Sequence, residues 1–276
     1  MVIILLGDFM KKIFITGAGS GLGKEASLKL ARRGHTVYAS VHYENQIEPL
    51  QKTATNENLN LKVFKLDVLN SKDRELILDY DIDTFINNAA IGNSSSVADI
   101  PIEKIEEVFN TNVFSNLHMI QLAIKNMIKV KKEGRIIILS SLVGRIPMPF
   151  LSPYCSTKFA LECFGICLNQ EMKLLKKLSG INIKVSLIEP GAYATGFNKE
   201  NNEKKYEWMN SKSYFSNYVS IIKENEIKIW NFLEQKPYTS ITNKYIKAVE
   251  DKNPKFRYSA PWWQSLFIQL GRIIGK

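Results

Sequence analysis

A tyrosine, a lysine and a serine stand at spacings that would allow acid–base chemistry. Tyr154 and Lys158 are four residues apart in a stretch with helical periodicity, so both project from one face of a helix. A free tyrosine has a pKa of about 10, and a nearby ammonium lowers it. Ser141, thirteen residues before Tyr154, has a hydroxyl that can donate a hydrogen bond to a substrate oxygen. The three residues together suit the reduction of a carbonyl.

A glycine-rich turn lies near the N-terminus, between a short apolar run and a helical pattern. Glycines allow the backbone to turn sharply and approach a pyrophosphate, and the N–H groups of the following helix attract an anion. The dinucleotide pattern G-x-G-x-x-G does not fit, because Leu22 takes the place of its third glycine. The turn still predicts a phosphate site, formed by Gly17, Gly19, Ser20, Gly21, Leu22 and Gly23.

These motifs resemble those of the short-chain dehydrogenase/reductase family, in order, over about residues 11–195. The cofactor motif T-G-x-x-x-G-x-G of that family matches Gly17, Gly21 and Gly23. The catalytic serine, tyrosine and lysine of that family match Ser141, Tyr154 and Lys158. The resemblance implies that Tyr154 is the general acid/base, that Lys158 contacts the nicotinamide ribose, and that the serine orients the substrate.

A fourth catalytic residue of the family matches Asn112, which by resemblance holds a water that links the lysine to solvent. An asparagine inside a helix has an unfavourable propensity and indicates a local kink. Asn110 is the alternative, but the following Val113 and Phe114 favour Asn112 in the family pattern.

Three further segments resemble cofactor-binding loops of the family. A carboxylate after the third strand would contact adenine, the N-N-A-G segment would stabilise the sheet beside the cofactor, and a P-G-x-x-x-T loop would flank the nicotinamide. Ala90 replaces the glycine of N-N-A-G, which is harmless unless that position needs a positive φ. The matching residues are Asp67, Val68, Asn88, Ala89, Ala90, Pro190, Gly191 and Thr195.

The end of the second strand bears on the choice of cofactor. An acid there would bind the ribose 2′-hydroxyl and select NAD, but Val41 stands at that place and no acid appears before Glu44. Ser40 or His42 could bind a 2′-phosphate instead. The sequence therefore favours NADP over NAD, although the arginine best suited to phosphate is missing.

Apolar runs alternate with helical patterns along the chain. Runs that are apolar on both faces are typical of parallel strands covered by helices. The alternation predicts a single-domain, doubly wound parallel sheet (Rossmann-like) flanked by helices, with residues 11–192 as the cofactor-binding and catalytic core. The runs are 13–16, 36–41, 61–66, 84–87, 135–140 and 183–188, and a long helix is expected over about 153–177.

The segment 193–235 holds nine aromatic residues in 43, about twice the average of the chain. We expect it to form a substrate lid, although these aromatics could instead pack a small core of their own. A pocket walled in this way suits a lipophilic ketone or alcohol, and residues 253–258 resemble relatives that act on steroids and retinoids. The expected substrate residues are Ser141, Val143, Met148, Phe150, Tyr154, Tyr193 and Phe197.

The C-terminal tail, residues 259–276, has an apolar stripe with helical spacing, formed by Trp262, Leu266, Leu270 and Ile273. We expect it to dock on the protein or a partner subunit rather than lie on a membrane, because its polar side carries little charge. By resemblance, a homodimer or homotetramer would form through the helices that contain Asn112 and Tyr154.

Composition excludes several classes of protein. The 276 residues are 45% hydrophobic and 23% charged, which is ordinary for a globular protein and not for a disordered one. The net charge of +10 is spread along the chain, so it favours an anionic small ligand and not nucleic acid. No apolar run reaches the ~18 residues of a membrane span.

The three cysteines, Cys155, Cys163 and Cys167, have no histidine or acid placed to complete a zinc site, so no metal is expected. We interpret them as reduced core thiols of a cytoplasmic protein. The apolar run at residues 2–6 is too short for a signal peptide, and Met10 could be the natural start in place of Met1.

Taken together, the sequence predicts an NAD(P)-dependent oxidoreductase that interconverts a carbonyl and an alcohol on a small lipophilic substrate. Two alternatives remain open. The same fold could serve epimerisation or enoyl reduction, or the protein could be a nucleotide-sensing or membrane-associated interaction protein without turnover.

Overall fold

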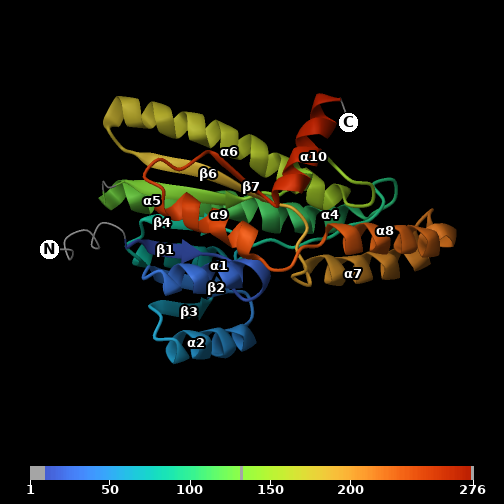
Figure 1. Ribbon diagram of the computed structural model, residues 1–276, viewed down its shortest axis with the longest axis horizontal. Helices are drawn as coiled ribbons and strands as arrows, with labels where there is room; N and C mark the ends of the chain where they lie inside the picture. The colour runs from blue at the N-terminus through green and yellow to red at the C-terminus, as the bar shows by residue number, and fades with distance from the viewer. Residues whose placement is uncertain (1–9, 131–132, 275–276) are drawn as a thin grey trace.

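The chain forms one sheet of seven parallel strands, with helices on both faces (Figure 1). This computed structural model describes residues 10–130 and 133–274; the run at 2–6 and the question of the start lie outside them. The predicted Rossmann-like fold class is confirmed. The strands are β1 (Lys12–Ile15), β2 (Thr36–Val41), β3 (Leu61–Lys65), β4 (Thr84–Asn87), β5 (Gly134–Leu139), β6 (Ile183–Pro190) and β7 (Arg257–Ala260).

The order of the strands in the sheet is β3-β2-β1-β4-β5-β6-β7. The direction of winding reverses between β1 and β4, because the chain runs outward to β3 and then returns to the other side of β1. In open parallel sheets a ligand binds beside such a reversal, outside the carboxyl ends of the strands. The glycine turn follows β1 and the Asn88 segment follows β4, so both lie at this point.

Two cores hold the helices on the sheet. Along β1, Ile13 and Ile15 point to one face and Phe14 to the other, as the alternation of a strand requires. The first face is covered by α1 (Gly21–Arg32), α2 (Ile47–Asn56) and α9 (Thr239–Glu250). The second is covered by α5 (Ser115–Val130) and α6 (Ser152–Ser179). The short helices α3 (Ser71–Glu75) and α4 (Ile102–Phe109) lie in connections.

The sequence patterns did not indicate β7 or α9. The strand β7 has only four residues, of which Tyr258 and Ala260 are buried, and it lies at the edge of the sheet. Such a short, half-polar run is not distinguishable from a loop by its pattern. The six strands that were expected are present, with ends that differ by one or two residues.

After β6 the chain leaves the sheet as α7 (Phe197–Lys212), a 3-10 turn η6 (Ser216–Tyr218) and α8 (Val219–Leu233). Figure 1 shows α7 and α8 side by side at one end of the sheet. They share a small core of their own, built from Tyr206, Met209 and Val219, against which Phe150, Trp208 and Phe215 pack. Several of the aromatics of this segment therefore stabilise it internally.

The tail forms α10 (Trp262–Ile273), but its contacts differ from the expectation. The apolar stripe is exposed: Trp262 is 76% and Ile273 81% accessible. The helix is held instead by the Trp263 ring, which packs edge-on against Phe232 (5.7 Å between centroids), and by a polar side chain. Gln264 is buried, accepts a hydrogen bond from the Ala192 N–H (2.9 Å) and donates one to the Leu233 carbonyl (2.7 Å). A pattern of hydrophobicity cannot reveal docking through the two hydrogen bonds of one buried amide.

The cysteines also need a correction. Cys155 is a buried core thiol, whereas Cys163 and Cys167 lie exposed on α6. In residues 10–130 and 133–274, no cluster of histidine, cysteine and acid side chains is arranged to hold a metal ion. None of the helices in that part of the chain is long and apolar enough to cross a membrane.

Candidate active site

The glycine turn between β1 and α1 has the geometry that an approaching phosphate requires. Gly17 and Gly21 adopt φ values of +67° and +53°, which other residues rarely adopt. A Cβ on Gly17 would lie 2.8 Å from the Ala89 Cα, so a larger residue does not fit. The first turn of α1 has no acidic residue, and no side chain caps it, so its N–H groups remain available to an anion. These features fit a dinucleotide.

Asn88 holds the glycine turn against β4. Its Nδ2 donates to the carbonyls of Thr16 (2.9 Å) and Gly17 (3.1 Å). Its Oδ1 accepts a hydrogen bond from the hydroxyl of Tyr245 on α9 (3.0 Å). Tyr245 is fully buried, and sequence reasoning missed it because α9 itself was not predicted. Ala90 does not have a positive φ, so its replacement of the family glycine causes no strain.

Replacing Tyr245 with Phe is expected to lower the free energy of unfolding by about 1–3 kcal/mol, because the buried Oδ1 of Asn88 loses its donor. Urea denaturation measures this loss. The matched control is Tyr214→Phe, which removes a hydroxyl from a ring that is 79% exposed and should change stability by less than about 0.5 kcal/mol. Equal stability of the two variants would contradict the role given to Tyr245.

The three residues of the catalytic motif lie together where β5 and β6 end. Ser141 follows β5 and begins a 3-10 turn, η5 (Leu142–Gly144); its hydroxyl donates to the Pro190 carbonyl (3.2 Å). Tyr154 and Lys158 stand on the first turns of α6, with the ammonium 5.5 Å from the centre of the tyrosine ring. The Lys158 Nζ donates to the Leu139 carbonyl (2.8 Å). The spacing read from the sequence therefore corresponds to one group in space.

Burial governs the charges of this group. It raises the pKa of Tyr154 above its ordinary value, and a hydrogen bond with Ser141 opposes the rise. Burial also lowers the pKa of Lys158 to about 7, and the carboxylate of Glu162 opposes that shift. Near neutral pH the lysine can thus gain or lose a proton, which a surface lysine does not do.

Asn112 lies in a π-helix, η4 (Asn110–Phe114), that interrupts the helical run between α4 and α5 at the expected kink. Asn112 is fully buried, whereas Asn110 is exposed, so of the two it is Asn112 whose side chain packs inside the protein. Its Oδ1 accepts from the Ile91 N–H (2.8 Å), and its Nδ2 donates to the Ile91 carbonyl (2.8 Å) and to Thr157 (3.2 Å). Through these hydrogen bonds, Asn112 connects the loop after β4 to α6.

The residues expected to meet the adenosine half lie after β2 and β3. The side chain of Val41 is fully buried in the core, and so is Ser40, which leaves His42 as the exposed residue at the end of β2. The His42 Nδ1 is 3.9 Å from a carboxylate oxygen of Asp67. Val68 is buried beside it. His42 and Asp67 are therefore the polar side chains that converge at this end of the crevice.

The loop after β6 closes over the glycine turn. A Cβ on Gly21 would lie 3.3 Å from the Thr195 Cβ, so the P-G-x-x-x-T loop lies directly above the turn. Gly191 packs against Gln264 of α10 with no room for a side chain. Pro190 contributes the carbonyl that accepts from Ser141. The cofactor loops of the two halves of the sheet thus meet.

The structure places the expected substrate residues in different surroundings. The Phe197 ring is 5.6 Å from the ring of Tyr154, and Val143 and Met148 are half-buried in the loop after Ser141. Phe150 has a positive φ of +59° and packs against Phe215 of the lid core. The side chain of Tyr193 is directed into the main core, where its hydroxyl bonds with Ser240 (2.8 Å). We therefore leave Tyr193 out of the substrate wall.

Comparison with known proteins agrees with this geometry. Residues 11–206 match the short chain dehydrogenase family. A probable short-chain type dehydrogenase/reductase of Helicobacter pylori, VdlC, is 34% identical over 215 residues, 73% of this chain and 75% of that protein. The 3-ketodihydrosphingosine reductase of Bacteroides thetaiotaomicron is 28% identical over 263 residues, 92% of this chain and 90% of that protein.

A solved structure has the same fold over almost the whole chain. A short chain dehydrogenase/reductase from Burkholderia phymatum in complex with NAD gives a TM-score of 0.81 at 17% identity, covering 96% of this chain and 94% of that one. The chain belongs to the short-chain dehydrogenase family. It is an NAD(P)-dependent oxidoreductase of that family.

Proposed function

We propose that the protein reduces the carbonyl of a lipophilic ketone or aldehyde, and oxidises the corresponding alcohol in reverse. The observation that carries the proposal is the position of Tyr154, whose ring centre lies 5.5 Å from the buried Lys158 ammonium and 5.6 Å from the Phe197 ring. A proton donor next to an apolar ring suits a substrate oxygen attached to a hydrophobic body.

Each residue of the group has a distinct task in this proposal. NADPH, when bound, supplies the hydride. Ser141 donates a hydrogen bond to the substrate oxygen and orients it. Tyr154 gives the proton to that oxygen, and Lys158 favours the phenolate that results. Asn112 keeps the loop after β4 fixed to α6, and we retain the expectation that it also supports a water chain from Lys158 to solvent.

The substrate class is inferred from the wall beside Tyr154. We propose that residues 193–235 act as the lid, with Phe197, Val143, Met148 and Phe150 as the apolar wall and residues 11–192 as the core of one domain. The relative from Bacteroides thetaiotaomicron is named for a 3-ketodihydrosphingosine, which supports a lipophilic ketone here. A panel of ketones of increasing chain length tests this. We expect kcat/KM to rise with chain length, and a preference for short polar ketones would contradict it.

We further propose that NADP is preferred over NAD. His42 is the exposed residue at the end of β2, where a carboxylate would repel a 2′-phosphate. The strongly basic chain, with a net charge of +10, favours the cofactor that carries the additional phosphate.

Replacing His42 with Asp is expected to weaken NADPH binding at least about tenfold, because the new carboxylate would face the 2′-phosphate. NADH binding should stay the same or improve. Nicotinamide fluorescence during titration measures both. Thr55→Asp on α2 is the control, since it adds a negative charge at an exposed position of another element. If the wild-type protein prefers NADH, the proposed preference is wrong.

For assembly, we propose a homodimer or homotetramer through α5 and α6. The groove between these helices is apolar, with a volume of about 620 Å³, and is lined by residues such as Ile120, Ile124, Leu161, Phe164 and Leu168. Phe159, Leu174 and Leu178 on α6 are exposed as well. An exposed apolar surface of this extent favours association of two copies.

A further inference from the structure

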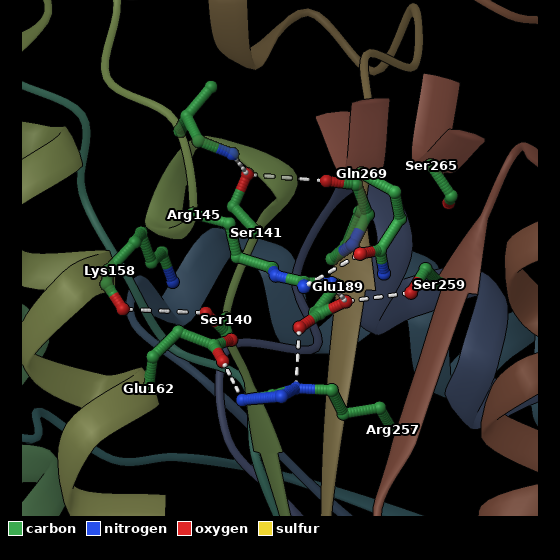
Figure 2. A network of polar contacts seen from close by, with 12 residues as sticks. Ser140, Ser141, Arg145, Lys158, Glu162, Glu189, Arg257, Ser259, Ser265 and Gln269 are labelled. Atoms are coloured by element: carbon green, nitrogen blue, oxygen red, sulfur yellow. Dashed lines mark hydrogen bonds and ion pairs between the residues drawn. The ribbon is translucent and has the colours of Figure 1, made fainter. Parts of the chain in front are cut away.

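A network of charged side chains, largely buried, lies beside Ser141 and Lys158 (Figure 2). Arg257 at the start of β7 donates to Glu162 on α6 (2.6 Å) and to Glu189 on β6 (3.1 Å). Glu189 is fully buried, accepts from the Ser259 hydroxyl (2.7 Å) and lies 3.5 Å from Arg145. The network therefore joins α6, β6, β7 and the loop after Ser141.

The ends of this network reach the catalytic elements. Glu162 follows Lys158 by one turn of α6, and Figure 2 shows both side chains leaving the same part of that helix. Glu189 precedes Pro190, whose carbonyl accepts the hydrogen bond from Ser141. Ser141 precedes the turn η5 and Arg145 follows it. The ion pair of Arg145 with Glu189 therefore holds the end of this turn against β6.

The network and Lys158 together carry one excess positive charge if Glu162 is ionised and two if it is neutral. Two arginines face two carboxylates, and Lys158 adds one more positive charge. If Glu162 were neutral, three cations would face one carboxylate, and water would screen the buried Lys158 and Arg145 only weakly. The group most able to respond is Lys158, since an arginine does not lose its proton in proteins.

We propose that Glu162 is a positioning residue that supplies the negative charge offsetting the buried ammonium of Lys158, and that Arg257, Glu189 and Arg145 hold it in place. The proposal rests on the proposed function, in which Lys158 must be charged to favour the phenolate of Tyr154. Glu162 touches neither substrate nor cofactor and acts through the lysine.

The titratable and charged groups that face Lys158 and Glu162 come from several elements. Tyr154 and Glu162 on α6 face Lys158, whereas Arg145 after η5, Glu189 on β6 and Arg257 on β7 face Glu162. Tyr154 in turn interacts with Cys155 and with Tyr245 of α9. Burial, and then the charge of Glu189, raise the pKa of Glu162 to about 7, whereas Ser140 and the two arginines oppose the rise. Glu162 thus changes its charge over the same pH range as Lys158.

The test is an NMR titration of protein labelled with 13C at the lysine ε-carbon, with the Lys158 signal assigned by its loss in Lys158→Met. In wild type we expect Lys158 to titrate near pH 7. In Glu162→Gln, which keeps the shape and removes the charge, its pKa should fall by roughly one to two units. In Glu162→Asp, which keeps the charge and changes the shape, it should stay near the wild-type value.

These variants separate a charge from a merely structural role. Equal titration of Lys158 in wild type and Glu162→Gln would overturn the proposal, as would equal shifts in the Gln and Asp variants. Glu75→Gln, which removes an exposed carboxylate of α3 that makes none of these contacts, should leave Lys158 unchanged. In the oxidation of an alcohol, where Tyr154 acts as the base, the acidic limb of the pH profile should move to higher pH in Glu162→Gln, because a neutral lysine no longer lowers the pKa of Tyr154.

A reciprocal measurement does not depend on the folding of the Gln variant. Coupling between two sites is mutual, so Lys158→Met must raise the pKa of Glu162. A 13C label at the glutamate δ-carbon reports it, and an unchanged pKa of Glu162 would contradict the proposal. Both titrations are made without substrate. A protein that turns over no ketone would therefore refute the proposed function and leave this inference to be decided by NMR.

Discussion

Replacing Tyr154 with Phe is expected to lower the rate of ketone reduction by about 10²–10⁴-fold and to leave the Kd of NADPH within about threefold of wild type. The phenol is the group beside the Lys158 ammonium that can give a proton to a substrate oxygen. Phenylalanine keeps the ring that packs against Phe197 and removes only the hydroxyl. Initial rates at saturating NADPH and a fluorescence titration of the cofactor measure the two quantities.

The matched control for this variant is Tyr80→Phe. Tyr80 stacks on Phe64 in the core on the face of the sheet that α5 and α6 cover, with ring centroids 5.5 Å apart, and its ring contacts are with Phe14, Tyr38 and Phe64 rather than with the catalytic group. It should keep the wild-type rate. Normal turnover in Tyr154→Phe would favour the alternatives in which this pocket senses a nucleotide or serves another reaction.

Replacing Gly17 with Ala is expected to raise the Kd of NADPH and NADH at least about tenfold, which corresponds to about 1.4 kcal/mol. The added Cβ would lie 2.8 Å from the Ala89 Cα and 3.2 Å from the Asn88 Nδ2, so the turn and the Asn88 segment must move apart. Because the cofactor is expected to lie on this turn, even a small displacement removes its backbone contacts. Fluorescence titration measures the change.

Gly180→Ala is the control that separates strain from binding. Gly180 ends α6 with a φ of +77°, close to the +67° of Gly17, but a Cβ there meets open space. Both variants should lose about 1 kcal/mol of stability through the positive φ. Only Gly17→Ala should lose cofactor affinity. Equal affinity in the two variants would mean that the turn is not the phosphate site.

Much of the fold followed from local patterns in the sequence. The strands β1, β2 and β4 to β6 are short runs of apolar residues buried on both faces, and such runs occur mainly in parallel sheets. The group of Ser141, Tyr154 and Lys158 could be predicted because the three residues lie on a strand end and one helix face, whose geometry is fixed by local structure.

Other features depend on contacts between distant parts of the chain. Tyr245 reaches Asn88 across 157 positions of sequence, and Arg257 reaches Glu162 across 95. No periodicity marks such partners. The tail shows the same limit, because its apolar stripe predicted a docked face while Gln264 makes the buried contact and Trp262 remains exposed. Val41 and Tyr193 were interpreted as facing the ligand, but both side chains are packed in the core.

The central claim is that a hydride passes from a nicotinamide to a carbonyl held by Ser141 and Tyr154. The most direct measurement is to incubate the protein with a long-chain ketone and NADPH that carries deuterium at both C4 positions of the nicotinamide, and to analyse the product by mass spectrometry. We predict an alcohol that carries one deuterium, formed by wild type and not by Tyr154→Phe. Ketone recovered unreduced from protein that binds NADPH tightly, across the whole panel of ketones, would contradict the account.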